Sequence, residues 1–150
     1  MAESRAKRMQ VVLVLAERNE QQAGQKVSQY RQQLDAEAEQ LRQLDDYANH
    51  YLQLYTDRKE SVKAQELIAY SGFIQRLGLA RKEQQAKLNK MEAALAQLQQ
   101  AWQQAYQKRE SIKDLIGRLQ NEENQLVDKR LQKELDELVG QAYARKTEIM

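Results

Sequence analysis

The chain has 150 residues, with no proline, no cysteine and five glycines, and its formal net charge is +2. A chain of this length forms one ordinary domain at most, the lack of cysteine excludes disulfides and thiolate metal sites, and so small a charge does not indicate a nucleic-acid partner. Hydrophobic residues make up 41% of the sequence and charged residues 31%, a composition typical of coiled coils and long exposed helices.

The first ten residues carry charge but lack the cleavage site of a signal peptide. No stretch of the chain approaches the roughly 20 apolar residues that a membrane-spanning helix needs. The absence of cysteine also suits a reducing compartment. We therefore expect a cytoplasmic protein that does not insert directly into a membrane.

An apolar seam runs through the first third of the chain. Counting from Ala6 in alternating steps of three and four gives fifteen positions, of which thirteen are apolar or aromatic. This heptad repeat is typical of a left-handed coiled coil, and the lack of proline leaves the helix unbroken. The pattern predicts a helix over about residues 4–56. The fifteen positions are Ala6, Met9, Leu13, Ala16, Glu20, Ala23, Val27, Tyr30, Leu34, Glu37, Leu41, Leu44, Ala48, Tyr51 and Tyr55.

The seam is interrupted at about residues 57–63, which we interpret as a turn, and it resumes in a predicted helix over about residues 64–146. Ser61 is a candidate N-cap for this second helix. Fourteen of its eighteen seam positions are apolar. They are Leu67, Tyr70, Ile74, Leu77, Arg81, Gln84, Leu88, Met91, Leu95, Leu98, Trp102, Ala105, Arg109, Ile112, Ile116, Leu119, Glu123 and Leu126.

Two charged stretches favour a hairpin over a parallel dimer of one continuous helix. Residues 35–46 have a net charge of −4, and residues 76–90 have a net charge of +4. In a hairpin that turns near residue 61, position i faces roughly 122 − i, so the acidic stretch meets the basic one. In a parallel homodimer, each stretch would face its own copy. Because such charges commonly set orientation, we expect a monomer with an all-α fold: a single coiled-coil domain over residues 1–150, folded as a long antiparallel two-helix hairpin.

The same geometry leaves the end of the second helix unpaired. Met1 would face a point near residue 121, so residues 122–150 overhang the first helix. Beyond Leu126 the apolar positions shift to a different stripe of the helix, and an exposed stripe needs another protein to cover it. Basic residues near both termini would steer association with that protein. The predicted binding residues are Arg5, Lys7, Arg8, Leu131, Leu135, Leu138, Ala142, Arg145 and Lys146.

A second candidate contact surrounds Phe73, the only phenylalanine, which lies one place off the seam. Gly72 and Gly78 flank it, and glycine is unfavourable inside a helix. A contact site and loose packing both remain open as interpretations. We interpret His50 as a solvated polar residue and Trp102 as a packing residue. The sequence contains no catalytic motif, so we expect no enzyme activity, no cofactor and no metal.

Several clusters of residues resemble the FliJ family of flagellar type III export proteins. The most specific cluster matches the pattern Y-x-x-F-I-Q-x-L, and the others are a first-helix signature, a tyrosine-containing stretch before the turn, and an acidic pair before a basic tail. In the same order, the clusters are Tyr70, Phe73, Ile74, Gln75 and Leu77; Leu13, Ala16, Glu17, Glu20 and Ala23; Leu44, Asp46, Tyr47 and Tyr51; and Asp136 and Glu137.

The resemblance implies a component of the flagellar export apparatus that is peripherally associated with the inner membrane through that apparatus. In this family the hairpin is similar to the central stalk of rotary ATPases. Its end with both termini enters the hexameric export ATPase, its shaft contacts the export gate membrane protein, and family members handle export chaperones. The gate-contacting patch corresponds here to Phe73, Leu77, Ala80 and Gln84, where the family often has histidine at the last position.

Three other functions stay open at this point. The chain could be an architectural parallel coiled-coil tether, the equivalent stalk of a virulence type III secretion system, or an RNA-binding helical arm. The Y-x-x-F-I-Q-x-L cluster favours the flagellar stalk over the virulence one, and the near-neutral charge disfavours the RNA-binding arm.

Overall fold

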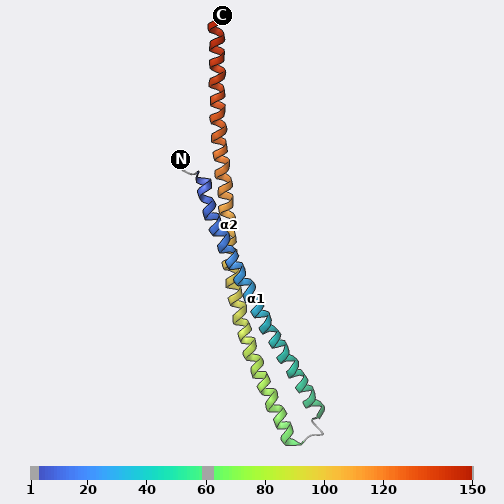
Figure 1. Cartoon of the computed structure of the whole chain (residues 1–150). Helices are drawn as coiled ribbons and strands as arrows, with labels where there is room; N and C mark the ends of the chain where they lie inside the picture. Colours follow the sequence, from blue (N-terminus) through green and yellow to red (C-terminus); the bar gives the residue numbers. More distant parts are fainter. Residues whose placement is uncertain (1–3, 59–62, 150) are drawn as a thin grey trace. The chain divides into compact units, whose positions relative to one another are not determined.

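The computed structural model describes residues 4–58 and 63–149, almost all of them in two helices. These are α1, Arg5–Arg58, and α2, Ala64–Ile149 (Figure 1). The described residues include no strand. Within the single chain, α1 and α2 run in opposite directions and contact each other. This confirms the predicted all-α antiparallel hairpin and not the parallel alternative. Ser61, the candidate cap of α2, lies outside the described residues.

The predicted seam is the surface along which the two helices pack. All fifteen predicted positions of α1 are buried or half-buried, as are fifteen of the eighteen predicted positions of α2. The exceptions are Arg81, Trp102 and Leu126, which are exposed. The agreement follows from the geometry of paired helices, because side chains spaced three and four residues apart share one face.

The chain divides into two compact units. The first comprises Met1–Glu20 and Ala105–Met150. Its core is a cluster of Leu13 and Ala16 from α1 with Ile112 and Ile116 from α2, and Met9 packs against the cluster. These side chains come from predicted seam positions, so apolar burial holds the start of α1 against α2.

Two side chains cap the start of α1. The hydroxyl of Ser4 accepts a hydrogen bond from the backbone N–H of Lys7 at 3.1 Å. The carboxylate of Glu123, on α2, accepts one from the backbone N–H of Ala6 at 3.3 Å. The first amides of a helix have no partner within the helix, so both contacts satisfy groups that would otherwise lack one. Glu123 thus explains one of the polar exceptions in the apolar seam.

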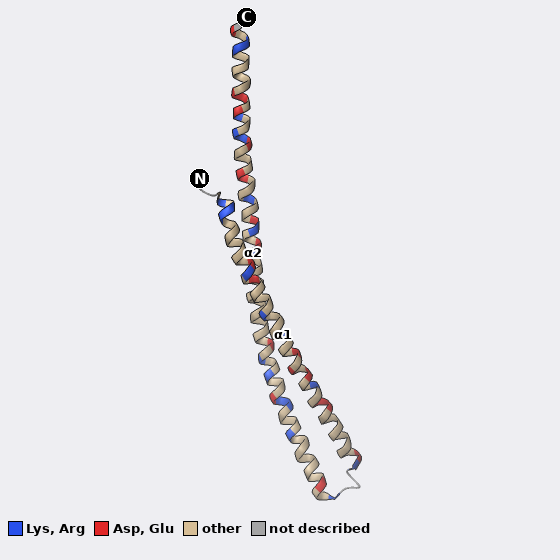
Figure 2. Cartoon of the chain, in the orientation of Figure 1, with Lys and Arg blue, Asp and Glu red and all other residues tan. Residues whose placement is uncertain are grey.

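The second unit, Gln21–Gln104, contains the two oppositely charged stretches. Asp45 forms an ion pair with Arg81, and Glu37 pairs with Lys87 at 2.8 Å. Acidic residues line this part of α1 and basic residues the facing part of α2 (Figure 2). The charge pairing predicted from the sequence is therefore present between the helices.

Gly24 marks a close approach between α1 and α2 in the same unit. A Cβ atom placed on Gly24 would lie 3.3 Å from the indole ring of Trp102. Trp102 therefore packs over the backbone of α1, although it remains 37% exposed. This contact agrees with the packing role expected for the tryptophan.

The alignment of the helices differs somewhat from the predicted rule. The rule requires the numbers of two facing residues to add up to about 122. For the contacting pairs Tyr51–Phe73 and Glu37–Lys87, the sum is 124. Ala6 and Glu123 give 129, so the start of α1 meets α2 later than expected. Leu126 was predicted to end the seam, but it is 64% exposed because the pairing ends before it.

Glu123 is the last half-buried residue of α2, and the exposed residues after it, 124–148, form what we call the overhang. Within residues 4–58 and 63–149, no helix contains a stretch long and apolar enough to cross a membrane.

Candidate partner-binding surfaces

The four residues of the predicted gate-contacting patch lie on the side of α2 that faces α1. Phe73, Leu77, Ala80 and Gln84 are all half-buried. The ring of Phe73 packs on that of Tyr51, with ring centroids 4.5 Å apart. Phe73 therefore contributes to the packing between the helices and also keeps part of its surface exposed, so the two interpretations of this residue are compatible.

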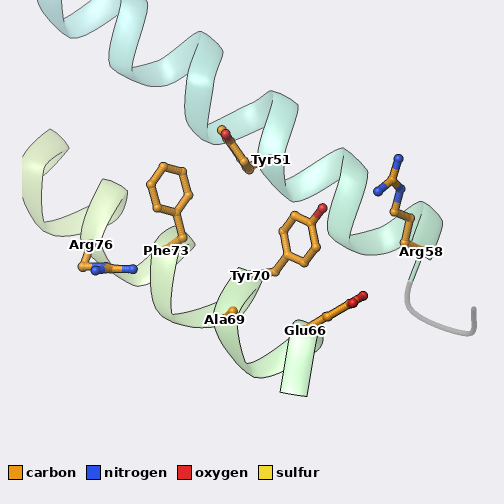
Figure 3. Close-up of a pocket in the computed structure, with 7 residues that line it drawn as sticks. All are labelled: Tyr51, Arg58, Glu66, Ala69, Tyr70, Phe73 and Arg76. Atoms are coloured by element: carbon orange, nitrogen blue, oxygen red, sulfur yellow. The ribbon is translucent and has the colours of Figure 1, made fainter. Parts of the chain in front are cut away.

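A groove of about 520 Å³ lies beside Phe73, between the ends of the helices nearest the turn. Figure 3 shows the rings of Tyr51, Tyr70 and Phe73 between α1 and α2. Charged side chains border these rings, and Arg76 lies 5.8 Å from the centre of the Phe73 ring. The residues lining the groove are Tyr51, Arg58, Glu66, Ala69, Tyr70, Phe73 and Arg76. An aromatic floor with a charged border can bind apolar side chains of another protein.

Gln84, the last residue of the patch, is part of a hydrogen-bonded group centred on Glu37. Its amide donates to the backbone carbonyl of Glu37 at 2.9 Å and also to the Glu37 carboxylate. Lys87 donates to the same carboxylate. The hydrogen bonds from Lys87 and from Gln84 lower the pKa of the Glu37 carboxyl below its ordinary value, because they favour its charged form. Gln84 thus joins the helices rather than projecting freely from the shaft.

The overhang places the other predicted contact residues in solvent. Every side chain from Asn124 to Glu148 is exposed. We call the row of Leu131, Leu135, Leu138 and Ala142 the overhang stripe; Leu135, for example, is 56% exposed. Further exposed apolar side chains, which the sequence analysis did not assign to this surface, are Val127, Val139 and Tyr143. Exposed apolar side chains thus recur along the whole length of the overhang.

The basic residues near the two termini do not form one cluster. Arg5, Lys7 and Arg8 are exposed at the start of α1, where the backbone N–H of Ala6 donates to Glu123 of α2. Arg145 is 22 residues further along α2 than Glu123, which at about 1.5 Å per residue is roughly 33 Å away. Any protein that binds both groups must therefore extend along the overhang.

A third exposed surface escaped the sequence analysis. Val11, Val14 and Leu15 are 66%, 54% and 52% exposed, on the side of α1 opposite the buried Leu13 and Ala16. We call these three residues the outer patch. The signal in the sequence was the uninterrupted apolar run at residues 11–16, since a helix that is half solvated normally has polar residues on its outer face.

The comparison with protein families decides what kind of protein this is. The family described as flagellar FliJ protein matches residues 5–148 of the 150-residue chain. The chain belongs to the FliJ family. It is therefore a component of flagellar protein export, which confirms the resemblance seen in its sequence. Searches among curated proteins and among solved structures found no match.

The most specific FliJ-like cluster forms part of the contact between the helices. Tyr70, Phe73, Ile74 and Leu77 are half-buried toward α1, whereas Gln75 is exposed. Four of the five residues of the Y-x-x-F-I-Q-x-L pattern are thus accounted for by packing in the hairpin. The exposed position borders a shallower groove lined by Gln75, Gly78, Leu79 and Lys82.

The described part of this FliJ-family chain offers no group of three histidines, cysteines or carboxylates that could hold a metal ion. The ring of His50 lies edge-on to that of Tyr51, with centroids 6.0 Å apart. The exposed apolar or aromatic surfaces of the described chain include the overhang, the start of α1 and the groove beside Phe73.

Proposed function

We propose that this FliJ-family chain is a stalk that docks its overhang and the start of α1 into the flagellar export ATPase. The observation that carries the proposal is the exposed overhang stripe, which lies on α2 past the start of α1, with no break in the helix before it. The basic residues Arg5, Lys7 and Arg8 would steer the approach of an acidic surface.

The groove beside Phe73 is the proposed contact with the export gate membrane protein, and through it the chain would associate peripherally with the inner membrane. Support comes from the half-exposed ring of Phe73 in an aromatic groove bordered by arginine. In this proposal the chain also helps to handle export chaperones, acts as a regulator of the ATPase, and catalyses no reaction of its own.

Truncation tests the ATPase contact. Deleting residues 127–150 should abolish binding to the ATPase and any stimulation of ATP hydrolysis. The hairpin should stay folded, because none of the described residues in the deleted segment belongs to the buried cluster. A truncated chain that still stimulates the ATPase fully would assign the contact to the paired helices. Leu79→Ala, which alters an exposed leucine elsewhere on α2, is the matched control.

The gate contact requires a control for lost packing, because Phe73 also touches Tyr51. Phe73→Ala should weaken binding to the gate protein in a pull-down or by calorimetry. Tyr55→Ala removes another half-buried aromatic side chain, but one that does not line the groove. If both variants bind the gate equally well, Phe73 serves only the packing of the helices.

A further inference from the structure

The outer patch is an apolar surface that α2 does not cover, because it lies on the side of α1 that faces away from α2. Leu13 and Ala16 are buried on the side of α1 that faces α2. On the opposite side, Val11, Val14 and Leu15 are exposed. Three adjacent β-branched and leucine side chains on a solvated face are unfavourable unless another surface covers them. A helix that is apolar on both sides is normally buried on both sides.

The charges around the outer patch define what could cover it. Lys7, Val11, Val14 and Arg18 follow one another in steps of three and four residues, so they share one face of α1. Residues 4–16 contain three basic side chains and no acidic one. Basic residues at a helix N-terminus oppose the helix dipole, and Glu123 of α2 supplies a single carboxylate there, at the N–H of Ala6. A surface that complements the outer patch is therefore apolar and carries negative charge.

The overhang stripe has this chemistry. Leu131, Leu135 and Leu138 are exposed in a row. Glu134 lies three residues after Leu131 and four before Leu138, so it flanks the stripe. The stripe therefore offers the basic outer patch an apolar row with a carboxylate, that of Glu134, beside it.

The overhang cannot reach the outer patch of its own chain. α2 is one continuous helix from Ala64 to Ile149, and the described chain has no residue with the positive φ that a reversal commonly uses. Folding back would require breaking this helix, with the loss of its backbone hydrogen bonds. A second copy of the chain can supply the stripe without any such change.

We propose that two copies of this chain associate reciprocally, with the overhang stripe of each copy covering the outer patch of the other. A two-fold axis lets both copies use both surfaces at once, so no apolar surface is left over to recruit a third copy. The hairpin of each copy keeps its own seam. This pairing needs no other flagellar protein, and it hides the overhang stripe from other partners until they compete for it.

The contact is small, so it is weak and depends on salt. Only a few apolar side chains are covered on each side, well below the area of a standard stable interface. The flanking charges contribute attraction that salt screens. We expect association within the range of about 1 µM to about 1 mM, and a fall in the associated fraction as salt is added.

Sedimentation equilibrium on the full chain, at rising concentration, tests the pairing. The mass should rise from 17.6 kDa toward about twice that value. Val11→Gln and Leu135→Gln should each leave the helix content unchanged and reduce the association at least tenfold. Leu79→Gln, an exposed apolar residue outside both surfaces, should change nothing. An equimolar mixture of the first two variants should regain part of the association, because one intact patch then meets one intact stripe.

Several outcomes would overturn the proposal. A chain that stays at the monomer mass up to about 1 mM does not pair, and a dimer that persists in Val11→Gln or Leu135→Gln uses other surfaces. A monomer that binds phosphatidylglycerol vesicles through Val11 would assign the patch to a membrane surface. These measurements contain no ATPase, so a failed pairing and a failed ATPase contact are told apart.

Discussion

The paired part of α2 and the overhang carry aliphatic side chains at similar spacing, but they bury them to opposite extents. Ile116 is 4% exposed, and Leu135, in the same helix, is 56% exposed. The backbone does not cause the difference, since both lie in one uninterrupted α-helix. The difference is the neighbour: α1 covers Ile116, and it begins at Arg5, beside Glu123. An apolar stripe on a helix therefore shows where a partner is needed, and only the rest of the chain shows whether the partner is internal.

Truncating one side chain in each region gives the largest contrast. Ile116→Ala should lower the free energy of unfolding by about 2–5 kcal/mol, because it leaves a cavity in the buried cluster. Leu135→Ala should change it by no more than about 0.5 kcal/mol, since the side chain is already solvated. Urea unfolding at low micromolar concentration measures both. Equal losses would mean that the overhang is packed against something in solution.

The boundary between the regions can be tested at Glu123. Glu123→Ala removes the acceptor for the backbone N–H of Ala6 and should cost about 1 kcal/mol, as the loss of a helix cap does. Glu123→Gln keeps an acceptor oxygen and should retain most of this stability. Glu122→Ala, one residue away on an exposed position, is the control. If Glu122→Ala costs as much as Glu123→Ala, the effect comes from the net charge of this segment and not from the cap.

Two glycines of α2 offer a smaller contrast. An added Cβ atom meets nothing within 4 Å at Gly117, in the paired part, or at Gly140, in the overhang. Gly117→Ala should raise the free energy of unfolding by about 0.5–1 kcal/mol, because alanine favours the helix. Gly140→Ala should leave global unfolding unchanged and slow only the amide hydrogen exchange of the overhang. A global gain from Gly140→Ala would show that the overhang unfolds together with the hairpin.

The smallest expected effect is a pH dependence of the unfolding free energy, and it involves only a residue of the paired region. The pKa of Glu37 is lowered in the folded chain by Lys87 and Gln84. The stabilisation from its charged form is therefore present above the unfolded pKa of about 4.3 and is lost as pH falls through the folded value. The difference in unfolding free energy between the wild type and Glu37→Gln should shrink as the solution is acidified through this range. A difference that does not change with pH would contradict the assignment.

Much of this architecture follows from the sequence, because heptad spacing defines one face of each helix and charge selects the partner. The seam positions and the pairing of the acidic stretch with the basic one are predicted in this way. The axial alignment is not, since a repeating seam looks the same after every seven residues. Glu123 appeared only as a polar exception, because its role depends on an amide 117 positions away. The outer patch was missed because a continuous apolar run does not reveal which of its residues are left uncovered.

Glu37 and Glu123 have a consequence for how the chain finds one structure. If α1 slid along α2 by seven residues, most seam leucines and alanines would meet equivalent side chains again. Glu37 would then lose Lys87 and Gln84, and Glu123 would no longer reach the N–H of Ala6. Polar groups left half-buried without partners are costly. The two glutamates thus select a single alignment among those that the apolar seam permits, as isolated polar residues do in other coiled coils.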